Sequence, residues 1–130
     1  MPHPLFHPAN FVVGWSLVLA AFVSGAIIGL RFHREDFLGG YASLRRRILR
    51  LGHVALAALG LFNVVFSICP LPAPGTAIAS IAGWGFIVGG ITMPVVCFLT
   101  AWQARFRHLF CVPVLALLCS TASILIGAIT

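Results

Sequence analysis

Histidine side chains at three places in this sequence have the chemistry to hold a cofactor. His33, His53 and His108 each lie close to arginines at the edge of a long apolar segment. Imidazole nitrogens bind haem iron, copper and zinc. If the apolar segments are helices that pack together, the three rings lie at one level. One hypothesis is therefore a binding site for haem b or copper, and the alternative is that no cofactor binds.

These three histidines also have ordinary structural explanations. His33 and His108 are flanked by arginines, and an imidazole at the edge of a membrane is commonly just solvated. His53 lies about one helical turn inside an apolar segment, where its ring needs a carbonyl, a water or a ligand as partner. His53 is therefore the main candidate of the three.

A second group of possible ligands is expected at the opposite ends of the helices. His3 and His7 belong to the segment MPHPLFHP, and Cys69 begins a proline-rich segment later in the chain. These side chains predict a copper or zinc site if they meet. The alternative is an ordinary proline-rich terminus without a metal.

The elements that must position these residues are predicted from composition. The chain has 130 residues, of which 61% are hydrophobic and 8% are charged, whereas soluble domains have roughly 25% charged residues. A soluble fold of this size would leave a large apolar surface in water. The composition therefore indicates an integral membrane protein.

Charge-free segments and helix breakers divide the chain into four spans. The first segment has twenty residues without a charge, or about 30 Å of helix, which matches a hydrocarbon core. Asn10 and Ser43 are plausible N-caps, and the segment CPLPAPG (69–75) breaks a helix. We predict helices over 11–30, 42–68 with a cytoplasmic extension, 76–102 and 109–129.

The basic residues predict the orientation of these spans. All eight are arginines, they lie in the first and third connections or beside them, and the formal net charge is +6. Such a charge in a soluble protein suggests nucleic acid, but here it flanks apolar spans, so we expect cytoplasmic loops that contact lipid phosphates. Both termini then lie on the non-cytoplasmic side, in a bacterial inner membrane. These arginines are Arg31, Arg34, Arg45, Arg46, Arg47, Arg50, Arg105 and Arg107.

Small residues predict how the helices pack. Each span has a stripe of glycine, alanine or serine, which lets helices approach closely in lipid, and a mid-span asparagine can bond across helices. With short connections, this predicts one domain over 1–130, an antiparallel up-down four-helix bundle. The residues expected to pack are Gly25, Gly29, Gly60, Asn63, Gly85 and Gly89.

The function predicted from these features is non-enzymatic. The sequence contains no soluble-enzyme motif, and its two acids, Glu35 and Asp36, lie outside the spans, which disfavours a small ion-coupled transporter. The leading hypothesis is an accessory subunit that packs against a larger respiratory or photosynthetic electron-transfer complex. The alternative is a redox protein that uses the three histidines. The expected partners are membrane lipids and other membrane subunits, without nucleic acid.

Overall fold

Residues 7–70 and 72–129 are described by the structure, which is a computed structural model. This part of the chain is all helical, and short 3-10 helices η1 (Phe37–Gly39) and η2 (Ala104–Phe110) lie in two of its connections. α1, α2, α3, and α4 together with η2 are each long and apolar enough to cross a membrane. The prediction of four candidate spans is therefore confirmed. The long helices are α1 (Pro8–Phe32), α2 (Leu44–Ile68), α3 (Ala77–Trp102) and α4 (Cys111–Ile129).

Hydroxyl side chains cap the N-termini of the two central helices, α2 and α3. Ser43 Oγ accepts a hydrogen bond from the Arg46 backbone N–H at 3.2 Å, which confirms the predicted cap of α2. Thr76 Oγ1 accepts from the Ala79 backbone N–H at 3.2 Å and begins α3 in the same way. Each cap satisfies a backbone donor that the first helical turn leaves free.

The start of α1 differs from the prediction. The helix begins at Pro8 rather than near residue 11, and His7 occupies the N-cap position without a side-chain bond. Proline suits this position because its missing N–H would have no partner there. The prediction that Asn10 caps the helix is therefore wrong. Asn10 lies inside α1 and is buried between helices.

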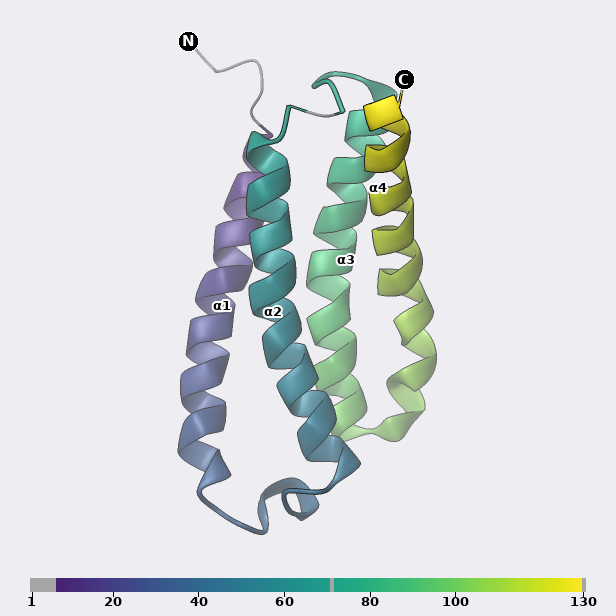
Figure 1. Cartoon of the computed structure of the whole chain (residues 1–130). Helices are drawn as coiled ribbons and strands as arrows, with labels where there is room; N and C mark the ends of the chain where they lie inside the picture. The colour runs from purple at the N-terminus through teal and green to yellow at the C-terminus, as the bar shows by residue number, and fades with distance from the viewer. Residues whose placement is uncertain (1–6, 71, 130) are drawn as a thin grey trace.

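Successive helices run antiparallel and lie side by side in chain order (Figure 1). α1 packs along α2, α2 along α3 and α3 along α4, with a smaller contact between α1 and α3. Among the described residues, no extensive contact joins α4 to α1 or α2. The bundle is therefore open along one side.

The two ends of this open bundle are named by what they carry. The basic end holds the connections 33–43 and 103–110, and the terminal end holds both ends of the described chain and the connection 69–76 (Figure 1). Seven of the eight arginines lie in the basic-end connections or in the first two turns of α2, and Arg31 lies in the last turn of α1.

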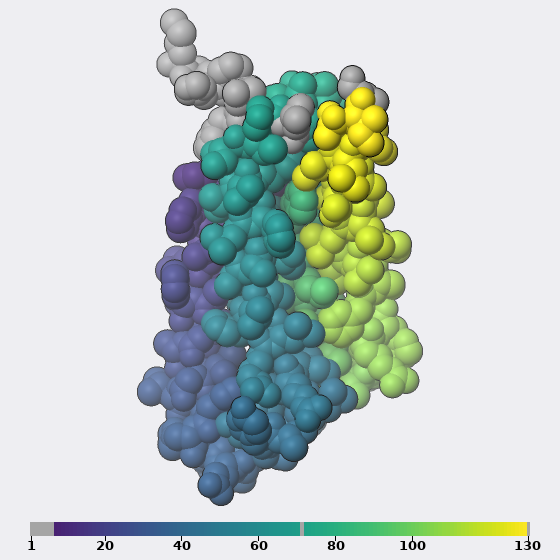
Figure 2. Space-filling model, viewed as in Figure 1, coloured from purple at the N-terminus to yellow at the C-terminus, as the bar shows by residue number. Residues whose placement is uncertain are grey.

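The open side forms a groove between α2 and α4, with α3 visible at its bottom (Figure 2). The volume of the groove is about 350 Å³. The residues that line it are apolar apart from one threonine: Leu59, Phe62, Phe86, Leu117, Thr121 and Ile124.

Two glycines face each other where α1 crosses α2. A Cβ atom at Gly14 would lie 2.7 Å from the Gly60 carbonyl oxygen, and one at Gly60 would lie 2.9 Å from the Gly14 carbonyl oxygen. Real Cβ atoms do not approach backbone this closely. This crossing therefore requires glycine on both helices, as in other small-residue contacts between membrane helices.

Candidate functional site

The three histidines proposed to bind a cofactor are not gathered into one site. His33 and His108 are exposed in the connections of the basic end, while His53 is half-buried in α2. Among residues 7–70 and 72–129, no three His, Cys, Asp or Glu side chains are close enough together to hold a metal ion.

His53 contacts α1 through the edge of its ring. Its Nδ1 lies 3.1 Å from Ser24 Oγ, and Ser24 Oγ also donates to the Ala21 carbonyl at 3.1 Å. Below the ring lies Gly25, where a Cβ atom would be 2.8 Å from His53 Cε1 and 3.3 Å from Nε2. Both ring nitrogens therefore face α1, and this arrangement favours a packing role for His53.

Two of the three residues proposed for a metal site at the terminal end, His7 and Cys69, lie in the described part of the chain. His3 lies outside the described residues. The ring of His7 stacks on Phe66 with 4.8 Å between centroids, and its backbone N–H donates to the Ser67 carbonyl at 2.9 Å. Cys69 is a half-buried free thiol at the C-cap of α2. His7 therefore holds the start of α1 against the end of α2.

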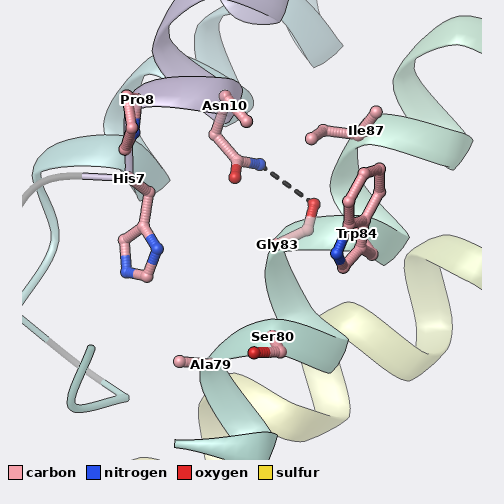
Figure 3. A pocket seen from close by; sticks show the side chains of 9 residues that line it. His7, Pro8, Asn10, Ala79, Ser80, Gly83, Trp84 and Ile87 are labelled. Carbon is pink, nitrogen blue, oxygen red and sulfur yellow. Dashed lines mark hydrogen bonds between the residues drawn. The ribbon is translucent and has the colours of Figure 1, made fainter. Parts of the chain in front are cut away.

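A cavity of about 180 Å³ lies beside His7 at the terminal end, between α1 and α3. Trp84, Ser80 and Ile87 line it from α3, and the Asn10 amide points across it towards Gly83 (Figure 3). His7 Nε2 is buried and has no hydrogen-bond partner among the described residues. Nevertheless, the backbone bond and the ring contact of His7 account for its position.

Asn10 and Asn63 form a buried polar contact between helices near the terminal end of the bundle. Asn10 Nδ2 donates to Asn63 Oδ1 at 2.9 Å and to the Gly83 carbonyl at 3.0 Å. Asn63 Nδ2 donates to the Phe86 carbonyl at 3.0 Å and to the Leu59 carbonyl at 2.9 Å. We call these two side chains the amide pair. It joins α1, α2 and α3, and its bonds satisfy polar atoms for which burial would otherwise be costly.

Small residues decide which helices meet the amide pair. A Cβ atom at Gly83 would lie 3.0 Å from Asn10 Oδ1, and one at Gly90 would lie 2.9 Å from Asn63 Nδ2. The other glycine face of α3, with Gly85 and Gly89, meets Ser120 and Leu117 of α4. α3 therefore has two smooth faces on different sides.

The remaining predicted packing residues lie on α1 and α2. Gly25 meets His53, and Gly60 meets Gly14 and Val18. Gly29 has no atom within 4 Å of the place where its Cβ would be. The small-residue stripe of α1 therefore packs within the chain only over its first part.

Arg46 is the one arginine buried inside the basic end. Only 3% of its surface is exposed, and its Nη2 donates to the Phe32 carbonyl at 2.7 Å. Its guanidinium also lies over the Phe32 ring, 4.2 Å from the centroid, and 5.4 Å from the centroid of Tyr41. A cation at this place is favourable because the last carbonyls of α1 carry partial negative charge. Arg46 thus fixes the end of α1 to the start of α2.

Other arginines make fewer contacts. Arg45 Nη2 donates to the Trp102 carbonyl at the end of α3, at 2.8 Å. Arg50 lies over the Tyr41 ring at 5.0 Å. Arg34 forms an ion pair with Asp36 at 3.9 Å, with both side chains mostly exposed. Five exposed arginines have no ion pair in the described part of the chain: Arg31, Arg45, Arg47, Arg105 and Arg107.

The described chain thus joins helices through its two asparagines, whereas most serine and threonine hydroxyls in the helices bond a carbonyl of their own helix, and its arginines are concentrated at one end. Sequence reasoning missed the inward position of Asn10. Pro8, which fits the first helical position, was the available signal. Comparison of the chain with protein-family models, with curated proteins and with solved structures found no match.

Proposed function

We propose that this chain is a small integral membrane accessory subunit that packs against a larger membrane complex, of the respiratory or photosynthetic electron-transfer kind. The observation that carries the proposal is the open groove between α2 and α4. A helix bundle that works alone in lipid gains by closing such a side, because helix packing is the main attraction available there.

The groove suits a transmembrane helix as its occupant. Phe62 and Leu59 form one wall, Leu117 and Ile124 form the other, and the floor is Phe86. Its only polar lining side chain, Thr121, already donates to the Leu117 carbonyl at 2.8 Å. An apolar helix can therefore enter without leaving a buried polar group unpaired.

The orientation belongs to the same proposal. We infer that the basic end faces the cytoplasm and the terminal end faces away from it, in a bacterial inner membrane. Arginines cluster at the basic end, and the described connection at the terminal end has no charged side chain. This distribution supports the inference through the positive-inside rule.

Photo-cross-linking during native purification tests the proposal. A photoreactive amino acid at Phe62 or Thr121 probes the groove, and the same amino acid at Leu19 or Phe22 probes the exposed outer face of α1. We expect the tagged chain, expressed at its native level, to purify with other subunits and to cross-link to one of them from the groove positions.

Two outcomes would contradict the proposal. A chain that always purifies alone or as a homo-oligomer is not an accessory subunit. Cross-links to a second polypeptide that arise equally from the groove and from the α1 face would show that the groove is not the contact.

A further inference from the structure

A second cavity, of about 220 Å³, is lined by residues of α2, α3 and η2 at the basic end. Its lining combines cationic and hydroxyl side chains, Arg45, Arg107 and Thr100, with apolar side chains, Leu44, Ile48 and Phe110.

Thr100 is unusual among the hydroxyl side chains of this structure. Its side chain lies in α3 and only 5% of the residue surface is exposed, yet Oγ1 has no hydrogen-bond partner among the described residues. Thr92, two turns earlier in α3, donates to the carbonyl four residues back at 2.6 Å. Every serine and threonine hydroxyl of residues 7–70 and 72–129 except Thr100 makes such an intrachain bond.

The charges of the two arginines at this cavity are not neutralised by a carboxylate of the described chain. The ion pair in the described part of the chain joins Arg34 to Asp36, so no carboxylate there neutralises Arg45 or Arg107. Arg45 uses one N–H to bond the Trp102 carbonyl, which leaves four of the five guanidinium donors. Arginine donors match phosphate oxygens in pairs.

We propose that this cavity is a binding site for a phosphate group. Arg45 comes from α2 and Arg107 from η2, so the bound anion joins the first turn of α2 to the connection between α3 and α4. The Thr100 hydroxyl supplies a neutral donor to the same anion. The apolar lining residues Leu44, Ile48 and Phe110 suit the glycerol and upper acyl carbons of an anionic phospholipid. A free phosphate ion offers the two arginines the same oxygen acceptors.

Lipid binding by purified protein in nanodiscs tests the site. The discs contain phosphatidylcholine with increasing fractions of phosphatidylglycerol, and bound lipid is counted by native mass spectrometry after release. Arg107→Gln is the main variant because its side chain is exposed and has no ion pair among the described residues. We expect its apparent affinity for phosphatidylglycerol to fall about tenfold, since hydrogen bonds to charged groups are worth that much.

Matched controls separate a site from diffuse attraction. Arg105 lies two residues before Arg107, and its guanidinium lies over Phe106, so Arg105→Gln is the control for Arg107→Gln. Arg47→Gln is the control for the same change at Arg45. Thr92→Val is the control for Thr100→Val, which removes the hydroxyl at the cavity. We expect each control to keep affinity within about twofold, because an exposed charge contributes little by itself. Equal losses in Arg105→Gln and Arg107→Gln would overturn the proposal.

Inorganic phosphate distinguishes the two sources of the anion. If millimolar phosphate binds to wild type and not to Arg107→Gln, while phosphatidylglycerol does not bind, the site is assigned to a free anion. If the lipid binds in an Arg107-dependent way, the site is assigned to the headgroup. If neither binds to wild type, the proposal is wrong. Arg107→Lys, which keeps charge but loses the paired donors, should retain only part of the affinity.

Discussion

Asn10 on α1 donates a hydrogen bond to Asn63 on α2 at 2.9 Å, in a part of the bundle where Asn63 has no exposed surface. The two amides occupy the place where three helices meet, because each also bonds a carbonyl of α3. Polar contact, in addition to apolar packing, therefore specifies the relative height of α1, α2 and α3. If one of the three helices slid by a turn past the other two, two of these three interhelical hydrogen bonds would break.

Replacement of Asn10 by leucine should destabilise the bundle. The change leaves Asn63 Oδ1 and the Gly83 carbonyl without their donor, and we expect a loss of about 1–2 kcal/mol in the free energy of unfolding. Unfolding by sodium dodecyl sulfate in mixed micelles measures it. Ser16→Ala is the control on the same helix, since Ser16 only bonds its own helix at Val12. If Asn10→Leu costs no more than this control, the amide pair is not a stabilising contact.

The spans of this fold were predictable because their signals are local. Long charge-free segments match the bilayer thickness, and the proline-rich segment 69–75 separates two of them. Ser43 was recognisable as a cap from its position before an amphipathic segment. Which neighbour each helix face meets was not predictable, because a helix that is apolar all round has no hydrophobic stripe. In α3, for example, Gly83 and Gly85 face different neighbours.

The candidate sites were predictable only in part, for a related reason. Asn63 was expected to bond across helices because it is a polar side chain within an apolar span. Asn10 looked like a cap because asparagine before an apolar segment usually is one. Thr100 gave no signal, since threonine in a helix ordinarily bonds its own backbone. That its hydroxyl lacks such a bond is visible only in three dimensions.

The glycine crossing between α1 and α2 gives a second prediction. Gly14→Ala and Gly60→Ala each place a methyl group within 3 Å of backbone in the facing helix. The helices must separate, and we expect each variant to lose about 1–3 kcal/mol of unfolding free energy. The same micelle titration measures this loss.

Gly29→Ala is the matched control for this crossing. It lies on the same helix, but its added methyl group enters open space. Because alanine favours helix over glycine, we expect no loss and a gain of up to about 1 kcal/mol. Similar losses at Gly14 and Gly29 would show that backbone flexibility, rather than close approach, explains the glycines of α1.

Arg46 should be intolerant of lysine although lysine keeps the charge. Lysine cannot lie flat over Phe32 while it bonds the Phe32 carbonyl, as the guanidinium does. We expect Arg46→Lys to cost about 1–2 kcal/mol through the stacked contact and the charged hydrogen bond. Arg47→Lys, on the exposed side of the same turn, should change stability by less than about 0.5 kcal/mol. Equal effects would mean that only the charge of Arg46 matters.

The effect of Gly25→Ala on stability should depend on whether His53 is present. His53→Ala removes a ring from the α1–α2 contact and leaves a cavity, which we expect to cost about 1–3 kcal/mol. Gly25→Ala in the wild-type chain places a methyl group 2.8 Å from His53 Cε1 and should also destabilise. In the His53→Ala background that methyl group has room, so Gly25→Ala should be neutral or stabilising there. A double-mutant cycle in mixed micelles measures this change of sign. If the two losses simply add, the ring does not pack on Gly25. Absorption spectra and metal analysis of the wild-type protein and His53→Ala test separately whether His53 is a cofactor ligand.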